Sequence, residues 1–169
     1  VEDVRIGWPS INHMGDGREV IISHAGIETG LHMVRRDAGT GSWEDSDLPN
    51  NAYLEDSTTV GNLWPRAAVG GLNDEIIHVI CITTPVANGG LEYQGQDGAL
   101  LYYRSLDYGD TWEMQTFPQL DTSNFINMSA DAYAIHAEGG TVAFAVFNDL
   151  QDSFVMISED AGDNWEYHI

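Results

Sequence analysis

Apolar residues along this chain come in short runs, each bounded by polar residues and by turns that contain glycine. The strongest runs are rich in β-branched and aromatic residues and cover positions 19–23, 76–82 and 141–147. None of them has the spacing of three and four residues that is typical of an amphipathic helix. Runs of this length and composition are typical of buried or half-buried strands, so the pattern predicts an all-β protein.

Each strong run has the same neighbours in the sequence. A shorter strand-like segment and a glycine turn precede it, another strand-like segment follows it, and a fourth segment comes after a shared polar motif. The chain therefore divides into three units with approximate bounds 1–50, 60–118 and 130–169. Tandem units of four short strands are typical of β-propeller blades. We expect a single partial β-propeller with about three four-stranded antiparallel blades.

The shared polar motif is clearest in the second and third units. Ser105–Glu113 returns as Ser158–Glu166, and a weaker copy, Arg35–Glu44, has one extra residue before its Trp. The motif resembles the Asp box, S-x-D-x-G-x-T-W, of the bacterial neuraminidase repeat family, whose members are β-propellers. The positions that carry this resemblance are Asp37, Gly39, Trp43, Ser105, Asp107, Gly109, Thr111, Trp112, Ser158, Asp160, Gly162 and Trp165.

The chemistry of the motif favours a structural role for its acidic residues. Gly109 and Gly162 can adopt a positive φ without steric cost, and Asp107 and Asp160 can accept hydrogen bonds from the amides of their own turn. The Trp at the end of each motif buries a large apolar face and anchors the turn. A calcium loop is the alternative, although neither copy has the alternating D-x-D-x-D-G ligand pattern. We predict turn clamps, with no metal site and no cofactor.

Long connections at the other end of the blades are the expected binding surface, since long loops commonly carry function. The connection 83–100 is rich in side chains that can bind sugar hydroxyls or a peptide, and an Arg on an inner strand is expected to face the central channel. The candidate ligand-binding residues are Arg66, Glu92, Tyr93 and Asp97. The alternative for the loop residues is a solvated loop, and for Arg66 and Arg104 it is an ion pair with one of the many carboxylates.

Charge limits the partners of the protein. The 169 residues carry 27 acidic and six basic side chains, all Arg, for a net charge of −21. This balance argues against nucleic acid, which is bound through cationic side chains, and against an anionic membrane surface. No apolar run reaches the ~20 residues of a membrane span. The single cysteine, Cys81, lies in an apolar run and is expected to be a small buried hydrophobe.

An acidic surface without lysine, together with one cysteine, favours a secreted or cell-surface protein. Asp boxes occur in sialidases, other glycosidases, receptors and an assembly factor, so the architecture alone does not give the activity. The resemblance to sialidases implies three converging Arg side chains that bind the substrate carboxylate, and this sequence offers no such set.

We therefore expect a module that binds glycan or protein ligands or scaffolds a surface assembly, and that is non-catalytic in itself. The alternative is part of a sialidase-like glycoside hydrolase whose other blades lie outside this chain. Three blades do not close a ring, so we expect the remaining blades to come from the same parent chain or from a partner subunit.

Overall fold

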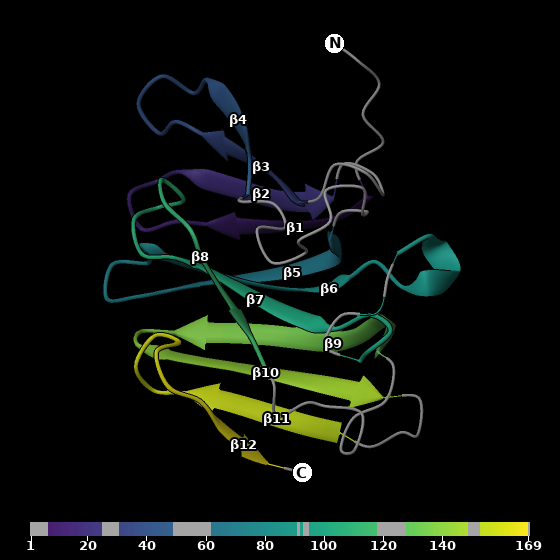
Figure 1. The fold of residues 1–169 in the computed structure, drawn as a ribbon. Helices are drawn as coiled ribbons and strands as arrows, with labels where there is room; N and C mark the ends of the chain where they lie inside the picture. The colour runs from purple at the N-terminus through teal and green to yellow at the C-terminus, as the bar shows by residue number, and fades with distance from the viewer. Residues whose placement is uncertain are drawn as a thin grey trace.

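A computed structural model describes residues 7–24, 31–48, 62–90, 92, 95–117, 128–148 and 153–168. These residues form three four-stranded antiparallel sheets, shown in Figure 1. The first sheet contains β1 (Gly7–His13), β2 (Glu19–His24), β3 (Leu31–Arg36) and β4 (Trp43–Asp47). The second contains β5 (Asn62–Gly70), β6 (Ile76–Thr83), β7 (Leu100–Ser105) and β8 (Glu113–Thr116). The third contains β9 (Met128–Glu138), β10 (Thr141–Asn148), β11 (Ser153–Ser158) and β12 (Glu166–His168).

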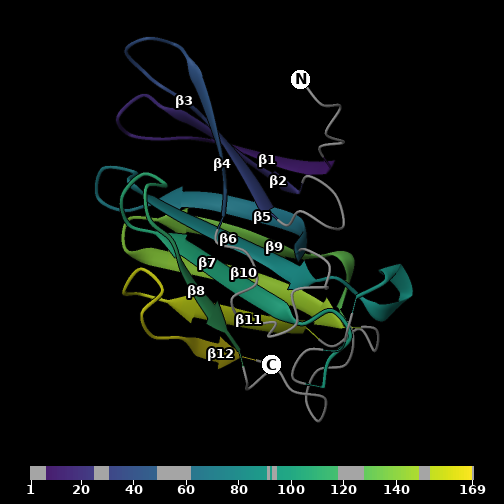
Figure 2. The ribbon, with the colours of Figure 1, turned by 45° about the horizontal axis from the view of Figure 1, so that its top comes forward.

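In every sheet the strands lie side by side in chain order, as in a β-propeller blade. The first strand of the second sheet, β5, lies against both β1 and β9, so the sheets stack in sequence (Figures 1 and 2). A backbone bridge between Gly71 and Gly139 joins the second sheet to the third. The prediction of an all-β chain with three four-stranded antiparallel blades is confirmed; the only helical segment in the described residues is the short 3-10 turn η1 (Val86–Asn88).

Burial along the strands follows from this stacking. β6 is buried at every position because the second sheet is covered on both faces, and its sequence is correspondingly apolar on both sides. β11 alternates between exposed and buried positions because the third sheet packs only against the second. One apolar core therefore lies between the first and second sheets, around Met33 and Val79, and another lies between the second and third, around Tyr102 and Phe144.

The stack has two distinct ends. The turns between the third and fourth strands of each sheet carry the repeated motif, and we call them the motif turns. They lie together at one end, on the left in Figure 1, whereas the β6–β7 connection with η1 lies at the opposite end, on the right. This arrangement separates the repeated acidic motif from the connection that carries Glu92 and Asp97.

Candidate functional site

The motif turn of the second sheet is built around Asp107. Its Oδ1 accepts hydrogen bonds from the Thr111 amide and the Ser105 hydroxyl, both at 2.8 Å, and its Oδ2 accepts one from the Thr111 hydroxyl at 2.6 Å. Ser105 Oγ in turn accepts from the Gly109 amide at 2.7 Å. Burial would raise the pKa of the Asp107 carboxyl, but the hydrogen bonds from Thr111 and Ser105 lower it overall. The carboxylate is thus occupied by its own turn.

The third sheet repeats this arrangement with one change of residue. Asp160 Oδ1 accepts from the Asn164 amide at 2.8 Å and from Ser158 Oγ at 2.7 Å, and Oδ2 accepts from Asn164 Nδ2 at 2.7 Å. Asn164 therefore takes the place that Thr111 has in the second sheet. The hydrogen bonds from Asn164 and Ser158 lower the pKa of Asp160 to about 2.

The first motif turn is looser. Asp37 Oδ1 accepts from the amides of Gly39 at 3.0 Å and Thr40 at 2.6 Å, and from the Thr40 hydroxyl at 2.8 Å. These bonds, led by those from Thr40, lower the pKa of Asp37. Two residues before the aspartate, where the other two turns have a serine, the first turn has Arg35, so it has no serine bridge to the aspartate.

Two consecutive residues in each full turn have a left-handed backbone. φ is 59° at Tyr108 and 91° at Gly109, and 57° at Ala161 and 95° at Gly162. At Gly162 the lack of a side chain is also required for packing, because an added Cβ would lie 2.2 Å from the hydroxyl oxygen of Tyr102. The third motif turn therefore sits directly on a side chain of the second sheet.

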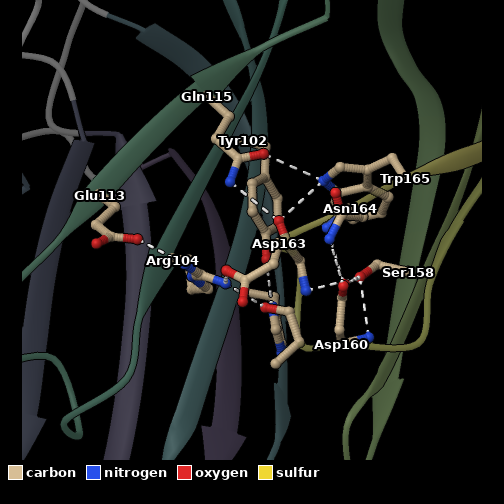
Figure 3. Close-up of polar contacts among 12 residues, drawn as sticks. Tyr102, Arg104, Glu113, Gln115, Ser158, Asp160, Asp163, Asn164 and Trp165 are labelled. Atoms are coloured by element: carbon tan, nitrogen blue, oxygen red, sulfur yellow. Dashed lines mark hydrogen bonds and ion pairs between the residues drawn. The ribbon is translucent and has the colours of Figure 1, made fainter.

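An arginine of the preceding sheet fastens each of these turns, as Figure 3 shows for Arg104. Arg104 Nη1 donates to the Ala161 carbonyl at 2.9 Å and to Asp163 Oδ1 at 2.6 Å, while Nη2 donates to Glu113 Oε2 at 2.6 Å. Its side chain is only 7% exposed. Burial would lower the pKa of the guanidinium, but the carboxylates of Glu113 and Asp163 raise it overall. The ion pair expected for Arg104 is confirmed.

Arg35 makes the same contacts one sheet earlier. Its Nη1 donates to the Tyr108 carbonyl at 2.8 Å and to Asp110 Oδ1 at 2.6 Å, and its Nη2 lies 3.6 Å from Glu44. We call Arg35 and Arg104 the cross-sheet arginines. Their reach into the next unit was not predicted from the sequence, although the signal was present: each lies two or three residues before the aspartate of its motif, and each stands opposite a Glu on the fourth strand.

A buried polar pair lies beneath the third turn. His78 Nδ1 is 2.6 Å from the hydroxyl of Tyr102, and both side chains are fully buried. Burial first, and the positive charge of Arg104 second, lower the pKa of His78 to about 4, so the imidazole is neutral at physiological pH. Burial likewise raises the pKa of the Tyr102 hydroxyl.

At the opposite end, the β6–β7 connection is tied together internally. Asp97 Oδ1 accepts from the Val86 amide at 2.6 Å, at the start of η1, and Thr83 Oγ1 accepts from the Ala99 amide at 2.9 Å. Asp97 thus shapes the connection, whereas Glu92 is exposed. Tyr93, the third candidate of this connection, lies outside the described residues.

Arg66 is the middle residue of β5 and pairs with Ile80 of β6. Its Nη1 donates to the carbonyl of Pro65 at 3.3 Å, and its side chain is half-buried. The structure therefore places Arg66 in the middle of a strand of the second sheet and Glu92 and Asp97 in the connection beyond that sheet's end, with Asp97 turned toward the backbone of its own connection.

The remaining groups offer little chemistry in the parts of the chain that the structure describes. Cys81 is fully buried as expected, and burial raises the pKa of its thiol. No group of three or more His, Cys, Asp and Glu side chains among the described residues is arranged to hold a metal ion. None of the described helices has the length and apolar character needed to cross a membrane.

Solved structures with a similar fold are sialidases. A mutant of Trypanosoma rangeli sialidase that displays trans-sialidase activity matches with a TM-score of 0.60 at 16% identity, over 96% of this chain and 30% of that one. Trypanosoma rangeli sialidase itself matches at 0.57 and 15% over the same shares. A mutant of NanB sialidase from Streptococcus pneumoniae matches at 0.53 and 15%, over 94% of this chain and 22% of that one.

No protein-family model and no curated protein sequence matches the chain. At these identities the structural likeness concerns the fold alone, and the chain spans about 30% of the length of the two trypanosomal proteins. The three sheets therefore have the fold of part of a sialidase-like β-propeller.

Proposed function

We propose that the chain is part of an extracellular Asp-box β-propeller that binds glycan or protein ligands or scaffolds a surface assembly, and that it is non-catalytic in itself. The hydrogen bonds of Asp107 and Asp160 support the Asp-box assignment, because each carboxylate is used to hold its own turn. A net charge of −21 supports a secreted or cell-surface location, since salt outside the cell screens self-repulsion.

The distribution of arginines carries the non-catalytic part of the proposal. A sialidase-like site needs converging Arg side chains to bind a carboxylate in bidentate fashion. Here Arg18, Arg35, Arg36 and Arg104 are all within 4 Å of carboxylates at the end of the motif turns. Among the described residues the one other arginine is Arg66, in the middle of β5, and one arginine does not make a clamp.

Glycans are the ligand class that best suits the β6–β7 connection, whose sequence contains two carboxylates, three side-chain amides and one tyrosine. We therefore expect a labelled chain to bind members of a glycan array, and the variant Glu92→Gln, Tyr93→Phe, Asp97→Asn to lose most of that binding. The matched control changes the same residue types elsewhere, as Asp74→Asn, Glu159→Gln and Tyr167→Phe, all of which are exposed. Equal binding by both triple variants would show that the β6–β7 connection is not the glycan-binding site.

Glycoside hydrolysis is the second candidate function, because the structural neighbours are sialidases. In that case this chain supplies Arg66 and sheets outside it supply the remaining arginines and the acid. Incubation of the chain with a fluorogenic sialoside distinguishes a binding module from a hydrolase. We expect no turnover by the chain itself, and hydrolysis that Arg66→Ala abolishes would contradict the non-catalytic proposal.

A further inference from the structure

The inner strand of the second sheet contains a strained bulge. β5 has one residue more than its partner β6 between two consecutive ladder pairs, so Trp64 and Pro65 both stand opposite Cys81. Trp64 has a φ of 54°, which is rare for a bulky residue, and a following proline restricts its backbone further. Bulges re-aim the side chains beside them, and strained residues cluster at functional sites. This bulge therefore points to a device that sets the direction of a side chain.

A tyrosine of the third sheet holds the bulge in place. The hydroxyl of Tyr133, on β9, donates a hydrogen bond to the carbonyl of Trp64 across the boundary between the two sheets. Tyr133 is 4% exposed and belongs to the apolar core of this boundary, and the Trp64 indole packs against the same core. β9 is itself irregular directly before Tyr133, where its ladder to β10 jumps from Val146 to Asn148. The bond thus joins two irregular inner strands and fixes the Trp64 carbonyl.

Arg66 is the first residue after the bulge. It pairs with Ile80, which lies in the core between the second and third sheets, and directly opposite residues of an antiparallel pair share one face. Arg66 therefore lies on the side of β5 that Tyr133 contacts. Its Nη1 donates to the carbonyl of Pro65 at 3.3 Å, so the guanidinium is folded back onto the bulge. Tyr133 and Arg66 thus hold the two successive carbonyls of the bulge.

The first sheet has the same bulge with a different residue after it. Trp8 and Pro9 stand together opposite one residue of β2, and Ser10 occupies the position of Arg66. Ser10 Oγ accepts from the Ala67 amide at 3.0 Å and donates to the Ala67 carbonyl at 3.3 Å. Ser10 therefore fixes the neighbouring inner strand, whereas Arg66 places a cation there. The bulge recurs as a platform, and the residue after it determines the chemistry.

We propose that Tyr133 is a positioning residue for ligand binding by Arg66. Its hydroxyl holds the Trp64 carbonyl and so keeps the left-handed bend, and the bend sets where the Pro65 carbonyl meets the guanidinium of Arg66. This role rests on the proposed binding function, in which Arg66 is a candidate contact. A guanidinium that is already fixed presents its planar set of donors to a ligand acceptor and loses less freedom on binding.

NMR of the arginine side chains tests this role without a ligand. The chain has six arginines, so a 15N-labelled sample gives at most six Nε–Hε signals, and Arg66→Lys identifies the signal of Arg66. We expect Tyr133→Phe to move that signal by more than its line width and to speed the exchange of its proton with solvent. Tyr102→Phe is the matched control and should leave the signal in place, because Tyr102 is a buried tyrosine of the same core whose hydroxyl contacts His78 instead.

Binding to a glycan array connects the position of Arg66 with function. Tyr133→Phe should weaken the same glycans as Arg66→Ala, by at least about tenfold, as the loss of one charge-assisted hydrogen bond does. It should add no further loss in the Arg66→Ala background, since the two residues act as one unit. Thermal unfolding checks that every variant is folded.

The two measurements separate this role from the binding function itself. A wild-type chain that binds no glycan would contradict the proposed function, whereas the NMR signal of Arg66 still decides whether Tyr133 positions it. An unmoved Arg66 signal in Tyr133→Phe, an equal movement in Tyr102→Phe, or additive losses of glycan binding in the double variant would overturn the positioning role.

Discussion

Arg104 and Asp163 form an ion pair across the boundary between the second and third sheets, with Nη1 and Oδ1 2.6 Å apart. The same guanidinium holds Glu113 of its own sheet and the Ala161 carbonyl of the next turn. One buried side chain thus connects the fourth strand of one sheet to the motif turn of the next. Because Arg35 repeats these contacts, the order of the sheets is fixed by polar bonds as well as by the apolar cores.

Loss of a cross-sheet arginine should destabilise the stack to a degree set by its burial. We expect Arg104→Ala to lower the free energy of unfolding by roughly 2 kcal/mol, since it removes charge-assisted hydrogen bonds from a buried position. Arg35→Ala should lower the free energy of unfolding by less. The Arg35 side chain is 17% exposed, against 7% for Arg104, and its Nη2 lies 3.6 Å from Glu44 Oε2. Urea unfolding measures both. An equal loss in the two variants would contradict this ranking.

The glycine of the third motif turn is expected to be irreplaceable. Gly162→Ala forces a side chain into a positive φ, at a cost of about 1–2 kcal/mol, and also drives its Cβ into the Tyr102 hydroxyl, which adds roughly 1–3 kcal/mol as overpacking does. Gly89→Ala is the matched control, since φ is 91° there and nothing lies within 4 Å of the added Cβ. Thermal unfolding should show a clearly larger loss for Gly162→Ala; equal losses would mean that the contact with Tyr102 relaxes freely.

Local features of the sequence predicted the fold well. The spacing of Asp, Gly and Trp predicted the motif turns, and the short apolar runs predicted the strands, because both signals depend on residues near in the chain. The cross-sheet bond from Arg104 to Asp163 joins residues 59 positions apart, and no strand or turn pattern specifies such a contact. Asp97 was predicted to bind a ligand for the same reason. Its hydrogen bond with the Val86 amide spans the β6–β7 connection, and no local pattern in the sequence specifies such a bond.

The β6–β7 connection should respond differently to its two described carboxylates. Asp97→Ala removes the acceptor of the Val86 amide at 2.6 Å, and we expect a loss of about 1 kcal/mol in stability together with faster amide exchange around η1. Glu92→Ala changes an exposed side chain and should leave both quantities as they are. Hydrogen exchange and urea unfolding measure the difference. Faster exchange in both variants would show that Glu92 also shapes the connection.

Acid should weaken the core between the second and third sheets through His78. Its pKa in the folded protein is about 4, against an ordinary 6.5, because burial and Arg104 oppose its charge. Between pH 6.5 and about 4 the unfolded chain therefore binds a proton that the folded chain does not, and stability falls by up to roughly 3 kcal/mol as the pH is lowered. His78→Gln keeps a hydrogen-bonding side chain beside Tyr102 but cannot titrate. Urea midpoints across this range should fall less steeply in the variant, and parallel curves would mean that His78 is protonated in the folded state.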